Sequence, residues 1–222
     1  MRTLPLLLAV GLAACSQPVT NTAPPKAPAA VVAEAPKTTA PAGDYELDHD
    51  HTSIDFRVNH IGLSQYTARF ADASGRLKFD PANPAAQAIE VTIPVASLKT
   101  DYKGPPALDF DKEVQTKFVG GAQNPQITFR STKVDVTGPA TARVTGDLTL
   151  NGVTRPIVID ARFNGGYAKG EMDPTAARIG FSGKTSFKRS DFGLKDGLPA
   201  PGTNMGVFDE VAVDIETEFT RK

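Results

Sequence analysis

Apolar residues recur at every second position in segment after segment of the chain beyond Gly43. In the first segment, charged residues separate Ile54, Phe56 and Val58, which is typical of a strand with one buried face. The alternation predicts further strands at Leu77 and Phe79; Ile89, Val91, Ile93 and Val95; Ile127 and Phe129; Val144, Leu148 and Leu150; Ile157, Ile159, Ala161 and Phe163; Ile179, Phe181, Thr185 and Phe187; and Val211, Val213, Ile215, Thr217 and Phe219. The pattern therefore predicts about eight strands.

Turn residues separate these segments. Asn151-Gly152 is the clearest pair, because a two-residue hairpin of type I′ needs positive φ at both central positions. Consecutive hairpins indicate an antiparallel meander, and a sheet of about eight strands closes into a small barrel with an interior cavity. The predicted fold is all-β, an eight-stranded antiparallel up-and-down barrel with a short helix in the long connection 105–121.

Alternate strand ends of such a meander share one rim. This places four polar residues at a common mouth: His60, Lys99, Asn151 and Arg189. Two long connections, 100–124 and 190–207, lie on the same rim. Connections of this length in compact domains are usually lids or binding elements, so we expect a gated opening there.

The first residues of the chain predict export. A charged start and the apolar run LPLLLAVGLAA, too short for a permanent membrane anchor, indicate a signal peptide over residues 1–14. The small residues before Cys15 resemble the lipobox of bacterial lipoproteins, which implies cleavage before Cys15 and acylation of its thiol. Because Ser16 is typical of lipoproteins sorted outward, we expect a lipid anchor in the outer membrane, facing the periplasm. An ordinary signal peptide with a stray cysteine is the alternative.

Composition divides the remainder of the chain. Residues 15–43 are rich in Pro and Ala and cannot bury enough apolar area to offset the entropy of ordering, so we expect a disordered tether. Residues 44–222 then form one domain. The formal net charge of −1 and the lack of a basic, aromatic-interleaved patch argue against nucleic acid as a partner.

All three histidines lie in the stretch DHDHTSIDFRVNH. His49 and His51 leave the same face of a strand, a spacing that zinc accepts when a third ligand is near. His60 is an odd number of positions from His51 and faces the other way unless a bulge intervenes. We therefore predict no metal site.

Two residues are candidates for contact with a ligand head group at the mouth. His60 shares the inward parity of the first strand, and its ring either donates to an oxygen of a ligand head group or bonds the rim backbone. Arg189 either pairs with a phosphate or belongs to a strand-exit turn, and the following Ser-Asp-Phe-Gly favours the turn.

Large apolar side chains at inward positions are the candidate cavity lining. The six chosen are Phe56, Val58, Phe129, Leu148, Phe181 and Phe187. Such a lining would bind a long apolar chain, with a few polar groups at the mouth fixing its orientation. The alternative is that these side chains fill a dry core.

Several motifs in one order resemble the YceI family of periplasmic lipid- and polyisoprenoid-binding proteins. They are YELDHDHTSIDFRVNHIGLS, GRLKFD, PQITFRST, GDLTLNGVTRPIVIDARFNGG, GFSGKTSFKRSDFGL and DEVAVDIETEF. The resemblance runs from Tyr45 to about Phe219 and implies a lipocalin-like barrel. It also implies a bound isoprenoid lipid, such as a polyprenyl phosphate or an isoprenoid quinone, and no required cofactor. Association into a homodimer stays open.

An enzyme is the competing class. The motif GFSGK lacks the G-x-S-x-G spacing, no glycine-rich loop opens a helix, and histidines near one strand cannot assemble a Ser-His-Asp triad. We therefore predict no catalytic residues and a carrier or storage protein. A quinone-dependent or hydrolytic envelope enzyme, and a scaffold that binds a membrane partner through its rim loops, are the alternatives.

Overall fold

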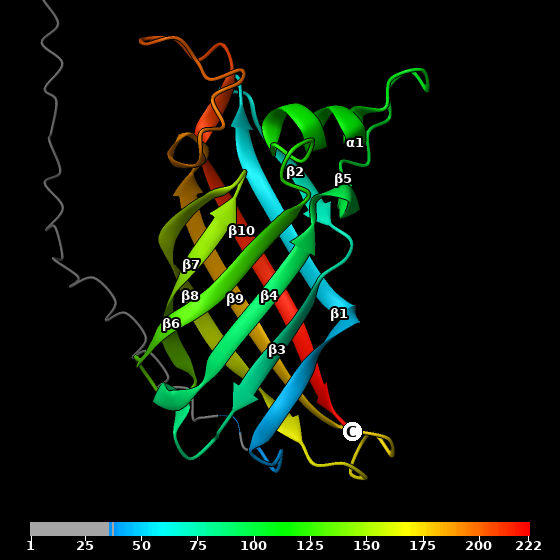
Figure 1. Ribbon diagram of the computed structural model, residues 1–222, viewed down its shortest axis with the longest axis vertical. Helices are drawn as coiled ribbons and strands as arrows, with labels where there is room; N and C mark the ends of the chain where they lie inside the picture. The colour runs from blue at the N-terminus through cyan, green and yellow to red at the C-terminus, as the bar shows by residue number, and fades with distance from the viewer. Residues whose placement is uncertain (1–35, 37) are drawn as a thin grey trace, which may run out of the picture. The chain divides into compact units, whose positions relative to one another are not determined.

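The computed structural model describes residue 36 and residues 38–222. The predicted signal peptide, Cys15 and the tether up to residue 35 lie outside the described residues. Within the described part, one antiparallel sheet closes into a barrel, with a short helix over the end that we call the upper rim (Figure 1). The end that holds the C-terminus is the lower rim. No helix in this part is long and apolar enough to span a membrane.

The sheet contains ten strand segments in the described residues. They are β1 (Gly43–His60), β2 (Ser64–Phe70), β3 (Ser74–Phe79), β4 (Ala88–Pro94), β5 (Leu98–Lys99), β6 (Gln126–Val136), β7 (Thr141–Leu150), β8 (Val153–Tyr167), β9 (Ala177–Lys188) and β10 (Val207–Arg221). The helical segments are α1 (Phe110–Glu113), the π-helical turn η3 (Val114–Phe118), and the short 3₁₀ turns η1 (Pro84–Ala86), η2 (Val95–Ser97) and η4 (Arg189–Phe192).

Strand β1 closes the barrel, because it pairs with β10 on one side and with both β2 and β3 on the other. Two strands of the meander are interrupted: β2 and β3 share the position beside β1, and β4 and β5 share the next. Counted this way the sheet has eight antiparallel positions around its axis, and the predicted up-and-down barrel is confirmed.

The predicted turn and helix are also found. Asn151 and Gly152 have φ values of 51° and 72°, the left-handed conformation that a type I′ hairpin requires. The long connection contains α1, whose first turn is capped by the Asp109 side chain accepting from the Lys112 amide. Strand β2 was not among the predicted strands, although Tyr66, Ala68 and Phe70 alternate with polar residues and pair with the inward face of β1.

Two clusters of buried side chains pack inside the barrel, one toward each rim. The upper cluster is Val95, Leu98, Val119, Ile127, Phe129, Leu148, Leu150, Phe192 and Leu194. The lower cluster is Ala40, Tyr45, Leu77, Phe79, Ala177, Ile179 and Phe219. Both lie within the compact unit Ala33–Lys222, which also holds every strand of the closed sheet. This unit therefore contains all that the barrel needs to fold on its own.

A strap formed by residues 38–42 packs against the lower rim. Thr38 forms a bridge with Gly166, Ala40 is buried, and the Tyr45 hydroxyl donates to the Pro41 carbonyl at 2.7 Å. The packed part of the chain therefore includes the end of the segment that composition assigned to the tether.

Charged side chains bridge a bulge in the closing ladder. The register of β1 against β10 shifts after Asp48, and Arg178 on β9 lies over this stretch. Its Nη1 is 2.5 Å from Asp48 Oδ2 and 2.6 Å from Glu218 Oε2, while its Nη2 is 3.4 Å from Asp173 Oδ2. One guanidinium thus links β1, β10 and the loop before β9 where backbone pairing is irregular.

We expect Arg178→Met to lower the free energy of unfolding at pH 7 by about 1.5–3 kcal/mol, the range for charged hydrogen bonds. Burial opposes ionisation of Asp48, but hydrogen bonds from Arg178 and His51 lower its pKa below the usual value. Hydrogen bonds from Thr175, with a smaller one from Arg178, lower the pKa of Asp173 to about 2. The contribution of these two carboxylates to the free energy of unfolding is fully present above their pKa in the unfolded chain, about 4. It is lost as the pH falls through their lower pKa values in the folded protein.

Urea denaturation of wild type and variant at pH 7 and at pH 3 measures this contribution. The stability difference between the two proteins should shrink at pH 3. The control is Arg143→Met, which removes the exposed ion pair between Arg143 Nε and Asp160 Oδ1, 3.8 Å apart. This variant should lose less than about 1 kcal/mol of stability. Equal losses in the two variants would contradict a special role for Arg178.

Candidate ligand-binding cavity

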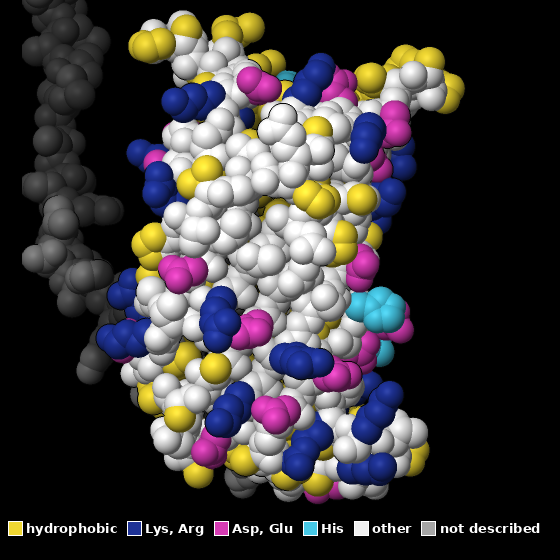
Figure 2. Space-filling model, in the orientation of Figure 1, with side chains coloured by type: hydrophobic (Ala, Val, Ile, Leu, Met, Phe, Trp, Pro, Cys, Tyr) yellow, Lys and Arg dark blue, Asp and Glu magenta, His cyan; other side chains and the backbone are white. Residues whose placement is uncertain are grey.

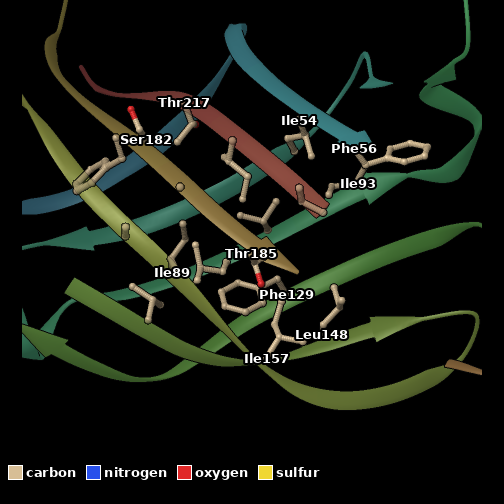
Figure 3. A pocket seen from close by; sticks show the side chains of 18 of the residues that line it. Ile54, Phe56, Ile89, Ile93, Phe129, Leu148, Ile157, Ser182, Thr185 and Thr217 are labelled. Carbon is tan, nitrogen blue, oxygen red and sulfur yellow. The ribbon is translucent and has the colours of Figure 1, made fainter. Parts of the chain in front are cut away.

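A cavity of about 830 Å³ lies along the barrel axis. Its wall is almost entirely apolar, and side chains from strands on all sides point into it (Figure 3). The lining extends from Tyr66 and Phe118 near the upper rim to Pro84 and Pro139 near the lower rim. A volume of this order is within the range of sites that hold one small-molecule ligand. The alternative of a fully packed, dry core is therefore wrong for this barrel.

All six predicted lining residues lie along this cavity: Phe56, Val58, Phe129, Leu148, Phe181 and Phe187. They differ in height. Phe129 and Leu148 belong to the upper cluster, whereas Phe181 stands 5.2 Å from Phe163 and 6.5 Å from Phe79 between ring centroids, in an aromatic group toward the lower rim. The predicted inward parity is confirmed, and contact of these residues with a ligand stays a prediction.

Small residues explain why the middle of the barrel stays open. Ala142, Ala161 and Gly183 lie side by side on β7, β8 and β9, and all three line the cavity. Their missing side-chain volume leaves space that Leu or Phe would fill in a packed barrel. Sequence reasoning missed them because it searched for large apolar residues; the available signal was small residues at inward positions of neighbouring strands.

The few hydroxyl groups in the wall have partners within the protein. Thr52 Oγ1 and Thr217 Oγ1 lie 2.9 Å apart, and the Thr185 hydroxyl donates to the Val158 carbonyl at 2.8 Å. These groups therefore need no polar partner from a ligand. The interior is suited to an apolar chain without polar groups along its length.

A lid covers the upper mouth. The Phe110 ring of α1 packs against Tyr102 and Tyr66, with centroid distances of 4.8 and 6.3 Å. Gln115 is buried, and its amide donates to the Ala96 and Leu98 carbonyls at 3.2 and 3.4 Å. The lid is thus a packed element fastened to the barrel wall.

Hydrogen bonds to an aspartate also attach this lid to the barrel. The backbone N–H and hydroxyl of Thr100 donate to Asp111 Oδ1 at 2.8 and 2.6 Å. These hydrogen bonds lower the pKa of Asp111 below its usual value. The start of the connection and α1 are therefore held together at neutral pH.

The four residues predicted to share the mouth all lie at the upper rim: His60, Lys99, Asn151 and Arg189. The last residue of β1, His60, pairs with Ser64 and Val207, lines the cavity and is exposed at its edge. It is the only histidine in the described residues that lines this cavity. Its position allows both predicted roles.

Arg189 is buried at the cavity wall. Its guanidinium donates to the backbone carbonyls of Phe208, Leu194 and Val207 at 3.1, 3.2 and 2.8 Å, and it stacks 5.9 Å from the Phe118 ring centroid. Burial lowers its pKa. The geometry favours the structural role: Arg189 joins the second long connection to the lid.

The other two histidines lie away from the cavity. A bulge in β1 brings His51 Nδ1 to 2.9 Å from Asp48 Oδ2, although residues three apart face opposite sides of a regular strand. Asp48, His51 and Glu218 offer ligand atoms within 4.8 Å of one another, but Arg178 donates to both carboxylates and occupies this position. The absence of a metal site stays a prediction, and a cation between Asp48, His51 and Glu218 would have to displace the guanidinium.

A closed antiparallel barrel of eight positions, with an apolar cavity beneath a short helical lid, defines a lipocalin-like barrel. The chain belongs to the YceI-like domain family, whose pattern matches residues 45–219. It is 39% identical over 186 residues to a UPF0312 protein of Pseudomonas savastanoi pv. phaseolicola, which covers 82% of this chain and 89% of the relative. A UPF0312 protein of Shewanella oneidensis is 37% identical with the same coverage.

Solved structures share the fold. A Campylobacter jejuni YceI protein is 30% identical with a TM-score of 0.60, over 74% of this chain and 90% of that one. BcnA of Burkholderia cenocepacia is 23% identical with a TM-score of 0.63, over 78% and 98%. A polyisoprenoid binding domain from Saccharophagus degradans is 15% identical with a TM-score of 0.58, over 80% and 98%. The latter two likenesses show the fold alone.

We expect Ala161→Phe to shorten the usable cavity. The added ring enters the row of small residues at mid-height, so the affinity for long polyprenols should fall about tenfold or more, while short ones bind nearly as before. Fluorescence competition with polyprenols of increasing length measures this. The control is Arg162→Phe, which adds the same ring on the solvent face one position away. Equal affinities across chain lengths in the Ala161 variant would place the ligand elsewhere.

Proposed function

We propose that this protein binds one long-chain isoprenoid lipid, a polyprenyl phosphate or an isoprenoid quinone, in the barrel cavity. It would hold or carry this lipid in the cell envelope without transforming it. The observation that carries the proposal is the continuous apolar cavity of about 830 Å³ along the barrel axis. Its paired threonine hydroxyls and apolar wall support a ligand that has no polar groups along its length.

The dimensions of the barrel suit an extended chain. Strand β10 has 15 residues, or about 50 Å at about 3.4 Å per residue. With a strand tilt of about 35–45°, the barrel is roughly 35–40 Å tall. Each methylene removed from water contributes about 0.8 kcal/mol, so several isoprene units supply ample driving force before association and ordering costs are subtracted.

Polar groups at the upper mouth are the proposed head-group contacts. His60 lines the cavity at the rim, and its imidazole can donate to a phosphate or quinone oxygen. Three of the five N–H groups of Arg189 donate to carbonyls within the described part of the chain, which leaves two for a phosphate oxygen. An anionic head group would also favour the charged form of this buried side chain.

Two further observations support the proposal. The solved polyisoprenoid binding domain from Saccharophagus degradans has the same fold. The lipobox-like sequence ending in Cys15 supports an acyl anchor, and we propose that it holds the domain at the outer membrane, facing the periplasm. Such a position would place the cavity beside the membranes that contain isoprenoid lipids.

Lipid extraction and mass spectrometry of protein purified without detergent test the proposal. We expect about one isoprenoid molecule per chain, or stoichiometric uptake of added polyprenyl phosphate or quinone by protein that has lost its ligand. Consistent absence of an apolar ligand, together with no uptake of either lipid, would exclude the carrier function.

The variant His60→Ala separates a carrier from an enzyme. A carrier should keep its isoprenoid chain but lose affinity several-fold or change head-group preference, because one polar contact at the mouth is removed. Isothermal titration with polyprenyl phosphate and with the matching alcohol measures the change. His49→Ala, an exposed histidine away from the cavity, is the control. Multiple turnovers of a bound lipid that disappear in the His60 variant would instead indicate catalysis.

A further inference from the structure

Three loops at the upper rim end in exposed apolar side chains. Leu63 lies between β1 and β2, Leu108 lies in the connection before α1, and Met205 lies in the connection before β10; they are 81%, 43% and 75% exposed. Figure 2 shows apolar side chains gathered at the tips of the two projections on this end of the molecule. We call these three residues the apolar crown.

Two of the three loops of the crown are held in place by backbone hydrogen bonds. The Ile61 amide donates to the Gly206 carbonyl at 2.8 Å, which joins the Leu63 loop to the Met205 loop. The Val207 amide donates to the Gly197 carbonyl at 2.7 Å and closes the base of the Met205 loop. Because the backbone of these loops is already ordered, their exposed apolar side chains lose little conformational entropy when they enter an apolar phase.

Tyr102 joins the cavity to the outer surface at the same rim as the crown. This side chain lines the cavity, contacts Phe110 of the lid and is still 41% exposed. An apolar path therefore leads from the interior past the lid to the outer surface. A lipid that follows this path avoids full exposure to water, provided that the rim lies against an apolar phase.

We infer that the apolar crown docks onto the surface of a phospholipid bilayer, so that the lipid passes directly between bilayer and cavity. The inference rests on the proposed function, because an isoprenoid lipid resides in bilayers. Separate apolar tips around an opening suit the headgroup boundary, into which single side chains insert. A second copy of the chain or a protein partner would be better matched by a flat, contiguous apolar face.

The charges around the crown indicate how it would bind. Residues 99–117 contain four Lys and four Asp or Glu, and residues 188–209 contain three Lys or Arg and three Asp. Neither segment has a net charge to attract anionic lipid. Binding should therefore occur on neutral phosphatidylcholine vesicles and depend weakly on salt.

The position of the strap allows the crown to face the bilayer. The strap reaches the barrel at the lower rim, at the opposite end from the crown. The 23 positions from Cys15 to Thr38 span up to roughly 70 Å at about 3.1 Å per residue. That reach exceeds the barrel height of roughly 35–40 Å. A chain anchored at Cys15 can thus turn its crown toward the same bilayer.

Vesicle flotation tests the inference with the compact unit, residues 33–222, which lacks the acylated cysteine. The wild-type unit should float with phosphatidylcholine vesicles, and Leu63→Ser combined with Met205→Ser should reduce the bound fraction about tenfold. Adding Leu108→Ser should reduce it further. The control is Met172→Ser combined with Val158→Ser, which removes apolar side chains that are 79% and 37% exposed away from the upper rim. This control should bind as wild type does.

Transfer of a labelled polyprenyl phosphate from the protein to vesicles separates docking from ligand binding. The wild-type transfer rate should rise with vesicle concentration, as for a collisional process. The crown variant should transfer at least several-fold more slowly while its equilibrium affinity for the lipid in detergent is unchanged. Lack of any lipid binding with normal flotation would exclude the proposed function and leave the docking surface intact.

Two outcomes would overturn the inference. One is equal flotation and transfer by wild type, crown variant and control. The other is no flotation by wild type, accompanied by concentration-dependent self-association that the crown variant abolishes in light scattering, which would assign the crown to contact between copies of the chain.

Discussion

The pairing of β1 with β10 is the constraint on which the structure depends. It removes both edges of the sheet and makes one set of alternate side chains face a common interior. The ladder is irregular after Asp48, and there the guanidinium of Arg178 joins three strands through carboxylates. Without this closure the inward side chains would line an open, exposed sheet, and no enclosed cavity would exist.

Closure alone does not create a binding site, because eight strands can also enclose a packed core. The two buried clusters stabilise the ends of the barrel, and the row of Ala142, Ala161 and Gly183 keeps its middle open. Members of both clusters, such as Phe129 and Phe79, also line the cavity, so the same side chains stabilise the barrel and form the wall of the candidate site. The lid, held by Gln115 and Asp111, and the second long connection, held by Arg189, complete the upper end. The same side of the molecule carries the mouth, the candidate head-group contacts and the apolar crown.

Much of this could be predicted from the sequence, since strand alternation and hairpin turns are local signals. The parity of Ile54, Phe56 and Val58 and the turn at Asn151-Gly152 fall in this class, and they led to the barrel. The sequence could not show features that depend on pairing between distant strands. The bulge that brings His51 to Asp48 and the three carbonyls that bind Arg189 are of this kind. The cavity volume was also hidden, because it depends on which small residues become neighbours in the closed sheet.

The proposed function requires that an apolar chain occupies the barrel axis. The decisive measurement is a crystal structure of the protein purified from its native host without detergent. A lipid on the barrel axis should give continuous tubular density from the mouth beside His60, past the row of small residues, toward the aromatic group at Phe181. An interior filled with ordered water, or lipid density found only on the outer surface of the barrel, would contradict it.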